Sequence, residues 1–123
     1  MPTYRGSCHC GAIRYEVDGE LDDLDVCNCS ICVRSAYIHW GVDPEHFRLL
    51  TPWSAIGTYE FGTRTAKHHF CRTCGISPFR VSRSEPGKIT VNARCLEGVD
   101  PETLSVTRFD GVRWEEEMTR RSS

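Results

Sequence analysis

The sequence predicts a mostly β protein with one or two small antiparallel sheets, few short helices, and bound metal ions that pin the sheets. Three observations predict this class. Short segments alternate apolar and polar residues with the period of two that is typical of half-buried strands. Glycine and proline separate these segments and mark frequent turns. Eight cysteines fall in two pairs, one triplet and one single position along 123 residues, which indicates metal sites.

The clearest strand signal lies in residues 12–17, "AIRYEV", where Ile13, Tyr15 and Val17 share one side and charged or polar residues share the other. The segment "KITVNA" repeats this alternation. Three further segments, rich in aromatic and β-branched residues, are predicted as strands. The additional predicted strands therefore cover residues 88–93, 57–62, 78–81 and 104–109.

Helix signals are sparse. Residues 30–37, "SICVRSAY", predict a short helical turn with Ser30 as its N-cap. A second short helix is predicted in "DPETL", with Asp100 as the cap and Pro101 at the first helical position, where proline is favoured.

Length and composition predict one domain spanning residues 1–123 and exclude several functional classes. The formal net charge of −2 gives no basic surface for nucleic acid. No window approaches the roughly 18 apolar residues of a membrane span, and the first residues lack the apolar core of a secretory signal. We therefore expect a cytoplasmic protein with reduced thiols and no nucleic-acid or membrane partner.

Two cysteine pairs predict a closed metal site. Cys8 and Cys10 in "GSCHCG" lie two residues apart, so on an extended chain both thiolates face one ion. Cys71 and Cys74 in "FCRTCGIS" have the C-x-x-C spacing of a zinc knuckle. Four thiolates form a structural zinc site, and such a site contributes on the order of 10 kcal/mol of metal-linked folding energy in zinc-finger peptides.

The triplet in "VCNCSICVRS" predicts a different kind of site. Cys27, Cys29 and Cys32 supply three ligands, and three protein ligands with one open position are typical of a catalytic zinc. Because three thiolates weaken zinc as a Lewis acid, such a site suits holding a substrate thiolate better than activating water, and zinc deprotonates a thiol that coordinates it.

Alternatives remain open for these cysteines. Cys95, or one of His68 and His69, would make the second site purely structural by supplying a fourth ligand. Iron in place of zinc and a disulfide framework are the other possibilities.

The cysteine motifs also carry a family resemblance. From "GSCHCGAIRYEV" through "CNCSICVRS" and "HHFCRTCGISPF" to "ITVNARCLE", the chain resembles the family of glutathione-dependent formaldehyde-activating enzymes, which includes centromere protein V. The resemblance covers about residues 4 to 100, and three motifs in this order are specific. It implies a β-tent fold with two zinc ions, and an enzyme that joins glutathione to formaldehyde as S-hydroxymethylglutathione or cleaves that adduct as a carbon–sulfur lyase. It also implies a structural zinc at the four-cysteine site and a catalytic zinc at the triplet.

An anionic thiol such as glutathione needs local cations. Arg34 is nearest in sequence to the triplet and is the predicted substrate-binding residue, and the further candidates are Arg64, Lys67, Arg72 and Arg83. Two functions remain: a zinc-dependent carbon–sulfur lyase acting on a small thiol and an aldehyde, and a non-catalytic zinc-stabilised binding module. A homodimer is also possible, because small β domains with open edges often pair.

Overall fold

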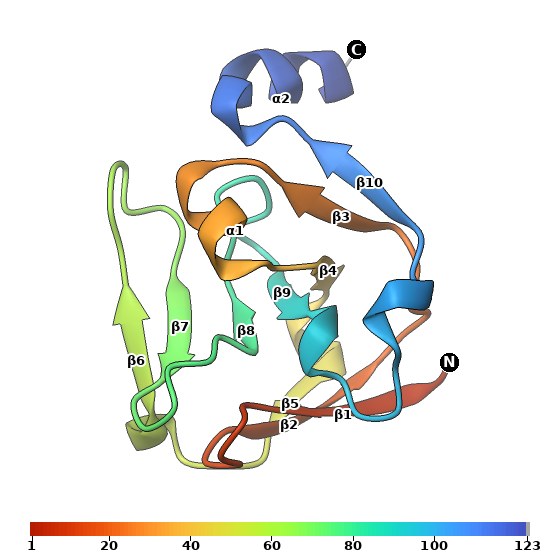
Figure 1. Ribbon diagram of the computed structural model, residues 1–123, viewed down its shortest axis with the longest axis vertical. Helices are drawn as coiled ribbons and strands as arrows, with labels where there is room; N and C mark the ends of the chain where they lie inside the picture. The colour runs from red at the N-terminus through yellow and green to blue at the C-terminus, as the bar shows by residue number, and fades with distance from the viewer. Residues whose placement is uncertain (123) are drawn as a thin grey trace.

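The computed structural model describes residues 1–122, and within them the chain forms three β-sheets joined by short helices (Figure 1). The first sheet has the order β1–β2–β5, with β1 at Thr3–Ser7, β2 at Arg14–Asp18 and β5 at Phe47–Leu49. The second sheet has the order β10–β3–β4–β9–β8, with strands at Val106–Phe109, Leu24–Cys27, His39–Val42, Ile89–Asn92 and Phe79–Arg80. The third pairs β6, Ile56–Tyr59, with β7, His68–Cys71. The mostly β class with small sheets is confirmed.

Most strand pairs are antiparallel, as predicted. Within residues 1–122 the exception is β10, which runs parallel to β3 and places Phe109 opposite Cys27. This pairing brings a segment from the end of the chain to the edge of the central sheet, next to the cysteine triplet.

The helices are short, and one of them differs from expectation. Helix α1 covers Ser30–Ser35, but its N-cap is Cys29, not Ser30. Cys29 has an extended backbone and its sulfur accepts a hydrogen bond from the Cys32 N–H, so a metal-ligand candidate takes the capping role that serine usually has. Helix α2, Trp114–Ser122, was not predicted from the sequence.

Within residues 1–122, five single 3₁₀ turns accompany the strands and helices. The predicted cap of Asp100 on one of them is confirmed, since its side chain accepts from the Glu102 N–H. These turns lie at Pro44–His46, Trp53–Ala55, Ala93–Cys95, Pro101–Thr103 and Gly111–Arg113. No helix among the described residues is long and apolar enough to cross a membrane.

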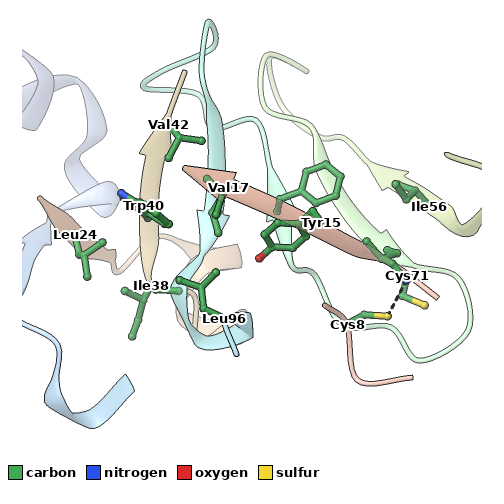
Figure 2. Packing of buried hydrophobic residues seen from close by; sticks show 14 residues of the cluster. Cys8, Tyr15, Val17, Leu24, Ile38, Trp40, Val42, Ile56, Cys71 and Leu96 are labelled. Atoms are coloured by element: carbon green, nitrogen blue, oxygen red, sulfur yellow. Dashed lines mark hydrogen bonds between the residues drawn. The ribbon is translucent and has the colours of Figure 1, made fainter. Parts of the chain in front are cut away.

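The core lies between the first and second sheets and confirms the alternation of residues 12–17. Ile13, Tyr15 and Val17 are fully buried, and the Tyr15 ring stacks on Phe47 with a centroid distance of 5.0 Å. Figure 2 shows Cys8 and Cys71 at one edge of this cluster, with their side chains close together. One cysteine of each of the two pairs is therefore built into the core.

The central sheet has one apolar and one polar face, and this division positions the candidate site. Trp40 and Val91 are paired and point into the core. The register pairs Asp25 with His39 and Arg80 with Thr90, and these four side chains belong to the opposite face because neighbouring residues in a strand alternate. Polar residues on strands β3, β4, β8 and β9 therefore collect on one side of the sheet.

Candidate metal centres and the pocket beside them

The structure gathers the first four cysteines at one point. Cys8 and Cys10 lie in the connection between β1 and β2, Cys71 ends β7, and Cys74 lies in the turn that follows. Their four sulfur atoms all lie within 4.8 Å of one another. The Cys10 sulfur lies 3.7 Å from that of Cys8 and 3.6 Å from that of Cys71. Four sulfurs at about 2.3 Å from a tetrahedral zinc are separated by about 3.8 Å, so these distances fit a zinc ion and not a disulfide.

Backbone N–H groups are directed at these sulfurs. Ile13 donates to Cys8 over 3.3 Å, and Thr73 and Cys74 donate to Cys71 over 3.3 and 3.4 Å. The Cys74 N–H in particular lowers the pKa of Cys71 to about 6. Hydrogen bonds to a thiolate favour the charged form that binds metal. These N–H donors therefore favour the thiolate form of the site before a metal ion binds.

The second cluster is built where strand β3 passes into helix α1. Cys27 ends the strand, Cys29 caps the helix, and Cys32 lies in its first turn. Their three sulfurs also lie within 4.8 Å of one another. The N–H of Cys29 donates to Cys27 and the N–H of Cys32 donates to Cys29, over 3.4 and 3.5 Å. The pKa of Cys29 is lowered because the Cys27 and Cys32 thiols donate to its sulfur. These three convergent sulfurs form a second candidate metal centre.

The alternatives for a fourth protein ligand are not supported. Within the described part of the chain, no histidine, carboxylate or further cysteine joins the three sulfurs within 4.8 Å. Cys95 lies near the first cluster instead, and burial raises its pKa to about 11, with the Cys8 and Cys74 charges adding to the shift. His69 bonds to Thr58 over 2.9 Å. The disulfide framework is also wrong, since all eight cysteines are free.

Sequence reasoning missed two residues that contact Cys32, Arg80 and His39, and a third, Asp25, that contacts His39. Arg80 donates from Nη2 to the Cys32 sulfur over 3.1 Å. The Nε2 atom of His39 lies 3.7 Å from the same sulfur, and its Nδ1 atom lies 2.8 Å from an Asp25 oxygen. Asp25 and Cys27 are two residues apart on β3 and so share a face. This spacing was the one sequence signal that could have placed Asp25 near the triplet. The strand pairing that brings His39 and Arg80 beside them was not readable from the sequence.

A cavity of about 470 Å³ opens onto the three cysteines. That volume lies within the range of roughly 300–1,000 Å³ for small-molecule sites. Arg80 and Arg83 line it, together with the aromatic rings of Phe61 and Trp114. Arg34 is not among its lining residues; its guanidinium donates to the Ser30 carbonyl over 2.8 Å and the residue lines a different cavity. Of the predicted cations, only Arg83 is brought to this cavity among residues 1–122.

The end of the chain supplies one wall of this cavity. Asn28, between two of the cysteines, donates from its side chain to Asp110 over 3.0 Å and accepts from the Val112 N–H over 3.1 Å. Trp114 lies under the Arg83 guanidinium at 3.7 Å. At Gly111 the chain lies so close to the triplet that an added Cβ would overlap the Cys27 sulfur and lie 2.8 Å from the Cys29 Cβ.

We expect Gly111→Ala to weaken the second metal centre selectively. The new methyl group must displace the Cys27 sulfur or the wall, and a misplaced ligand or supporting group commonly lowers metal affinity by roughly 10–100-fold. Competition with a chromophoric chelator measures zinc affinity at each centre. Gly87→Ala is the matched control, because a Cβ at Gly87 meets nothing within 4 Å. Equal affinities in both variants would mean that the wall yields without moving the sulfurs.

The comparison with known families decides the identity of this arrangement. Residues 3–108 match the family model described as glutathione-dependent formaldehyde-activating enzyme. The chain belongs to this family. The match covers well over half of the chain and contains all seven cysteines of the two clusters, so the resemblance read from the motifs is confirmed. It ends just before the cavity wall formed by residues 109–114, which therefore lies outside the matched part.

A solved structure agrees with this assignment of fold. The crystal structure of a protein from Rhodobacter sphaeroides, a structural genomics target, is 40% identical in sequence and superposes with a TM-score of 0.78. The similarity covers 85% of this chain and 97% of that one.

The residues present fit the metal that the family resemblance implies. Both clusters consist of cysteine sulfurs, a soft donor set that suits zinc, and the first has the spacing of a tetrahedral four-sulfur site. Both clusters are compatible with bound metal ions, and a family named for glutathione and formaldehyde supplies the chemistry to be tested.

Proposed function

We propose that this protein is a zinc-dependent carbon–sulfur lyase that joins a small thiol of the glutathione type to formaldehyde or a similar small aldehyde, and cleaves the resulting S-hydroxymethyl adduct. In this proposal Cys8, Cys10, Cys71 and Cys74 hold a structural zinc within a single domain, residues 1–123. The observation that carries the proposal is the triplet of Cys27, Cys29 and Cys32, which has three convergent sulfurs and faces a cavity of about 470 Å³.

The reaction requires little beyond positioning a sulfur. A zinc ion held by Cys27, Cys29 and Cys32 would supply one property, the ability to keep a thiol deprotonated near neutral pH. The thiol sulfur forms a bond to the carbonyl carbon, the π electrons of the carbonyl move to its oxygen, and that oxygen gains the proton that the thiol lost. Cleavage is the reverse of this step, and neither direction needs an oxidant or a reductant.

The chain's own residues orient the reactants. The polar face of the central sheet supplies the floor of the cavity, and Phe61 and Trp114 supply apolar walls. Arg83 is at the cavity and offers a positive charge to the carboxylates of a glutathione-like thiol. Arg34 remains a candidate for the same role, although its side chain lines a neighbouring cavity.

The thiols support a proposal about the cellular setting. Eight free cysteines are compatible with a reducing compartment, so we propose a cytoplasmic location. A homodimer stays a prediction.

The proposal is tested by following adduct formation directly. We expect the freshly purified protein to carry two zinc ions per chain by native mass spectrometry. We also expect it to accelerate the exchange between free glutathione and S-hydroxymethylglutathione, which two-dimensional exchange NMR measures against the uncatalysed rate. The affinity for glutathione, measured at low salt in Arg83→Ala and in Arg34→Ala, shows which arginine binds the carboxylates of the thiol.

A protein that carries two zinc ions but does not accelerate adduct exchange, with glutathione or with smaller thiols, would contradict the proposed enzymatic activity. The non-catalytic binding module would then be the better description.

A further inference from the structure

Arg80 is a buried cation that contacts a metal-ligand candidate, Cys32. The residue is 2% exposed. One terminal nitrogen donates to the Cys32 sulfur over 3.1 Å and also to His39 Nε2, and the other lies 3.2 Å from His68 Nδ1. Within residues 1–122, the ion pairs that arginines form do not include Arg80. Because an unpaired buried charge is strongly destabilising, this guanidinium requires negative charge at the sulfurs.

The surroundings hold the guanidinium in one orientation. Arg80 donates to His39 Nε2, which must therefore accept, so the His39 proton lies on Nδ1 and is donated to Asp25 over 2.8 Å. The guanidinium also lies over the Tyr37 ring, 3.8 Å from its centre. Burial lowers the pKa of His68 to about 4, so this neighbour is neutral and accepts from Arg80 without adding charge. Strand pairing, a histidine and an aromatic ring together direct one positive charge at Cys32.

That charge changes which ligand the second centre prefers. A zinc ion with three thiolates carries a formal charge of −1. A fourth thiolate adds another negative charge in a site partly removed from water, whereas a neutral nitrogen ligand adds none. A fixed cation in contact with one of the sulfurs offsets the added repulsion, and it does so for an anionic ligand alone.

We infer that Arg80 is the positioning residue that makes the Cys27–Cys29–Cys32 centre selective for an anionic sulfur ligand over a neutral one. The inference rests on the proposed function, because it explains why the site accepts a thiolate. It concerns a residue that contacts the centre through Cys32 and not the substrate itself.

The test compares two small ligands on the zinc-loaded protein. 2-Mercaptoethanol binds as a thiolate and has no other charge, so it does not report on Arg83, and imidazole is the neutral probe. Isothermal titration calorimetry gives the Kd of each ligand for wild type, Arg80→Met and Arg80→Lys, after metal content is verified. In Arg80→Met we expect the Kd of 2-mercaptoethanol to rise by roughly 10–100-fold, as for other residues that support metal ligands, with little change for imidazole.

The conservative variant separates charge from structure. Arg80→Lys keeps the positive charge and should restore most of the thiol affinity. If Arg80→Met does not fold, Arg80→Gln carries the same comparison with a polar side chain that can still donate to Cys32. Equal losses for both ligands, or no loss in a neutral variant, would overturn the role of Arg80.

The proposed function fails differently. A wild-type protein that binds no thiol at the second centre would overturn both proposals. A wild type that binds thiol with a preference unaffected by Arg80 would overturn only this one.

Discussion

Cys10→Ser is expected to remove the metal from the four-cysteine cluster and with it most of the stability of the protein. Cys10 is exposed, and a substitution at an exposed position usually changes the free energy of unfolding by less than about 0.5 kcal/mol. Its sulfur nevertheless lies 3.6 Å from that of Cys71 and completes the four-sulfur set. A structural zinc contributes on the order of 10 kcal/mol in small domains, comparable to the whole stability of about 5–15 kcal/mol of a typical domain.

Two consequences are measurable. Native mass spectrometry should show the loss of the zinc of the first centre, and circular dichroism should show a large drop in melting temperature or an unfolded chain at 25 °C. Cys95→Ser is the matched control, because Cys95 is more buried than Cys10 yet lies outside both clusters. If the effect is due to metal, Cys10→Ser lowers the melting temperature more than Cys95→Ser. If it is due to packing alone, the more buried Cys95 gives the larger decrease. A Cys10→Ser protein that melts like wild type would contradict a structural metal.

The sequence predicted those parts of the fold in which a local pattern decides the outcome. The alternation of residues 12–17 placed three core side chains correctly, because one buried face fixes strand orientation. The first cluster was also readable from the spacing of its two cysteine pairs, and the glycines that follow the pairs, Gly11 and Gly75, have positive φ, of 84° and 82°.

What the sequence left undecided depends on long-range pairing. Arg80 reaches Cys32 across 48 residues because β8 joins the central sheet beside β9. Nothing in the short segment "PFRV" indicates that partner. Likewise, Cys95 was a candidate fourth ligand because of its thiol, and Arg34 was the candidate substrate-binding residue because it is close to the triplet in sequence. Tertiary packing places both residues away from the cavity. Helix α2 was missed because few of its residues are apolar, so no helical periodicity marks it, although the three glutamates of its first turn favour a helix start.

The arrangement of the two clusters suggests that they act independently. The first lies where the β1–β2 connection meets the end of β7, at the bottom of Figure 1, and the second lies at the start of α1 in its upper half. No cysteine belongs to both groups among the described residues. A change confined to the second cluster should therefore leave the first one, and the fold it supports, in place.

Cys29→Ser is expected to abolish metal binding at the second centre and all thiol-adduct activity, while the fold survives. The substitution removes one of the three converging sulfurs, the one whose pKa is lowered by donation from Cys27 and Cys32, and leaves only two sulfur ligands. It also spares the local structure. Cys29 caps helix α1, and serine is among the preferred N-cap residues, so the helix keeps its cap when it loses its metal ligand.

The expected protein carries one zinc ion, melts within about 5 °C of wild type, and shows no acceleration of adduct exchange. Native mass spectrometry, thermal unfolding and exchange NMR measure the three properties on one sample. If both zinc ions leave on this single change, the two centres are coupled and cannot be divided into one that stabilises and one that reacts. If the second zinc leaves and activity remains, the reaction takes place elsewhere in the cavity, and the three sulfurs serve only to hold β3, α1 and the C-terminal wall together.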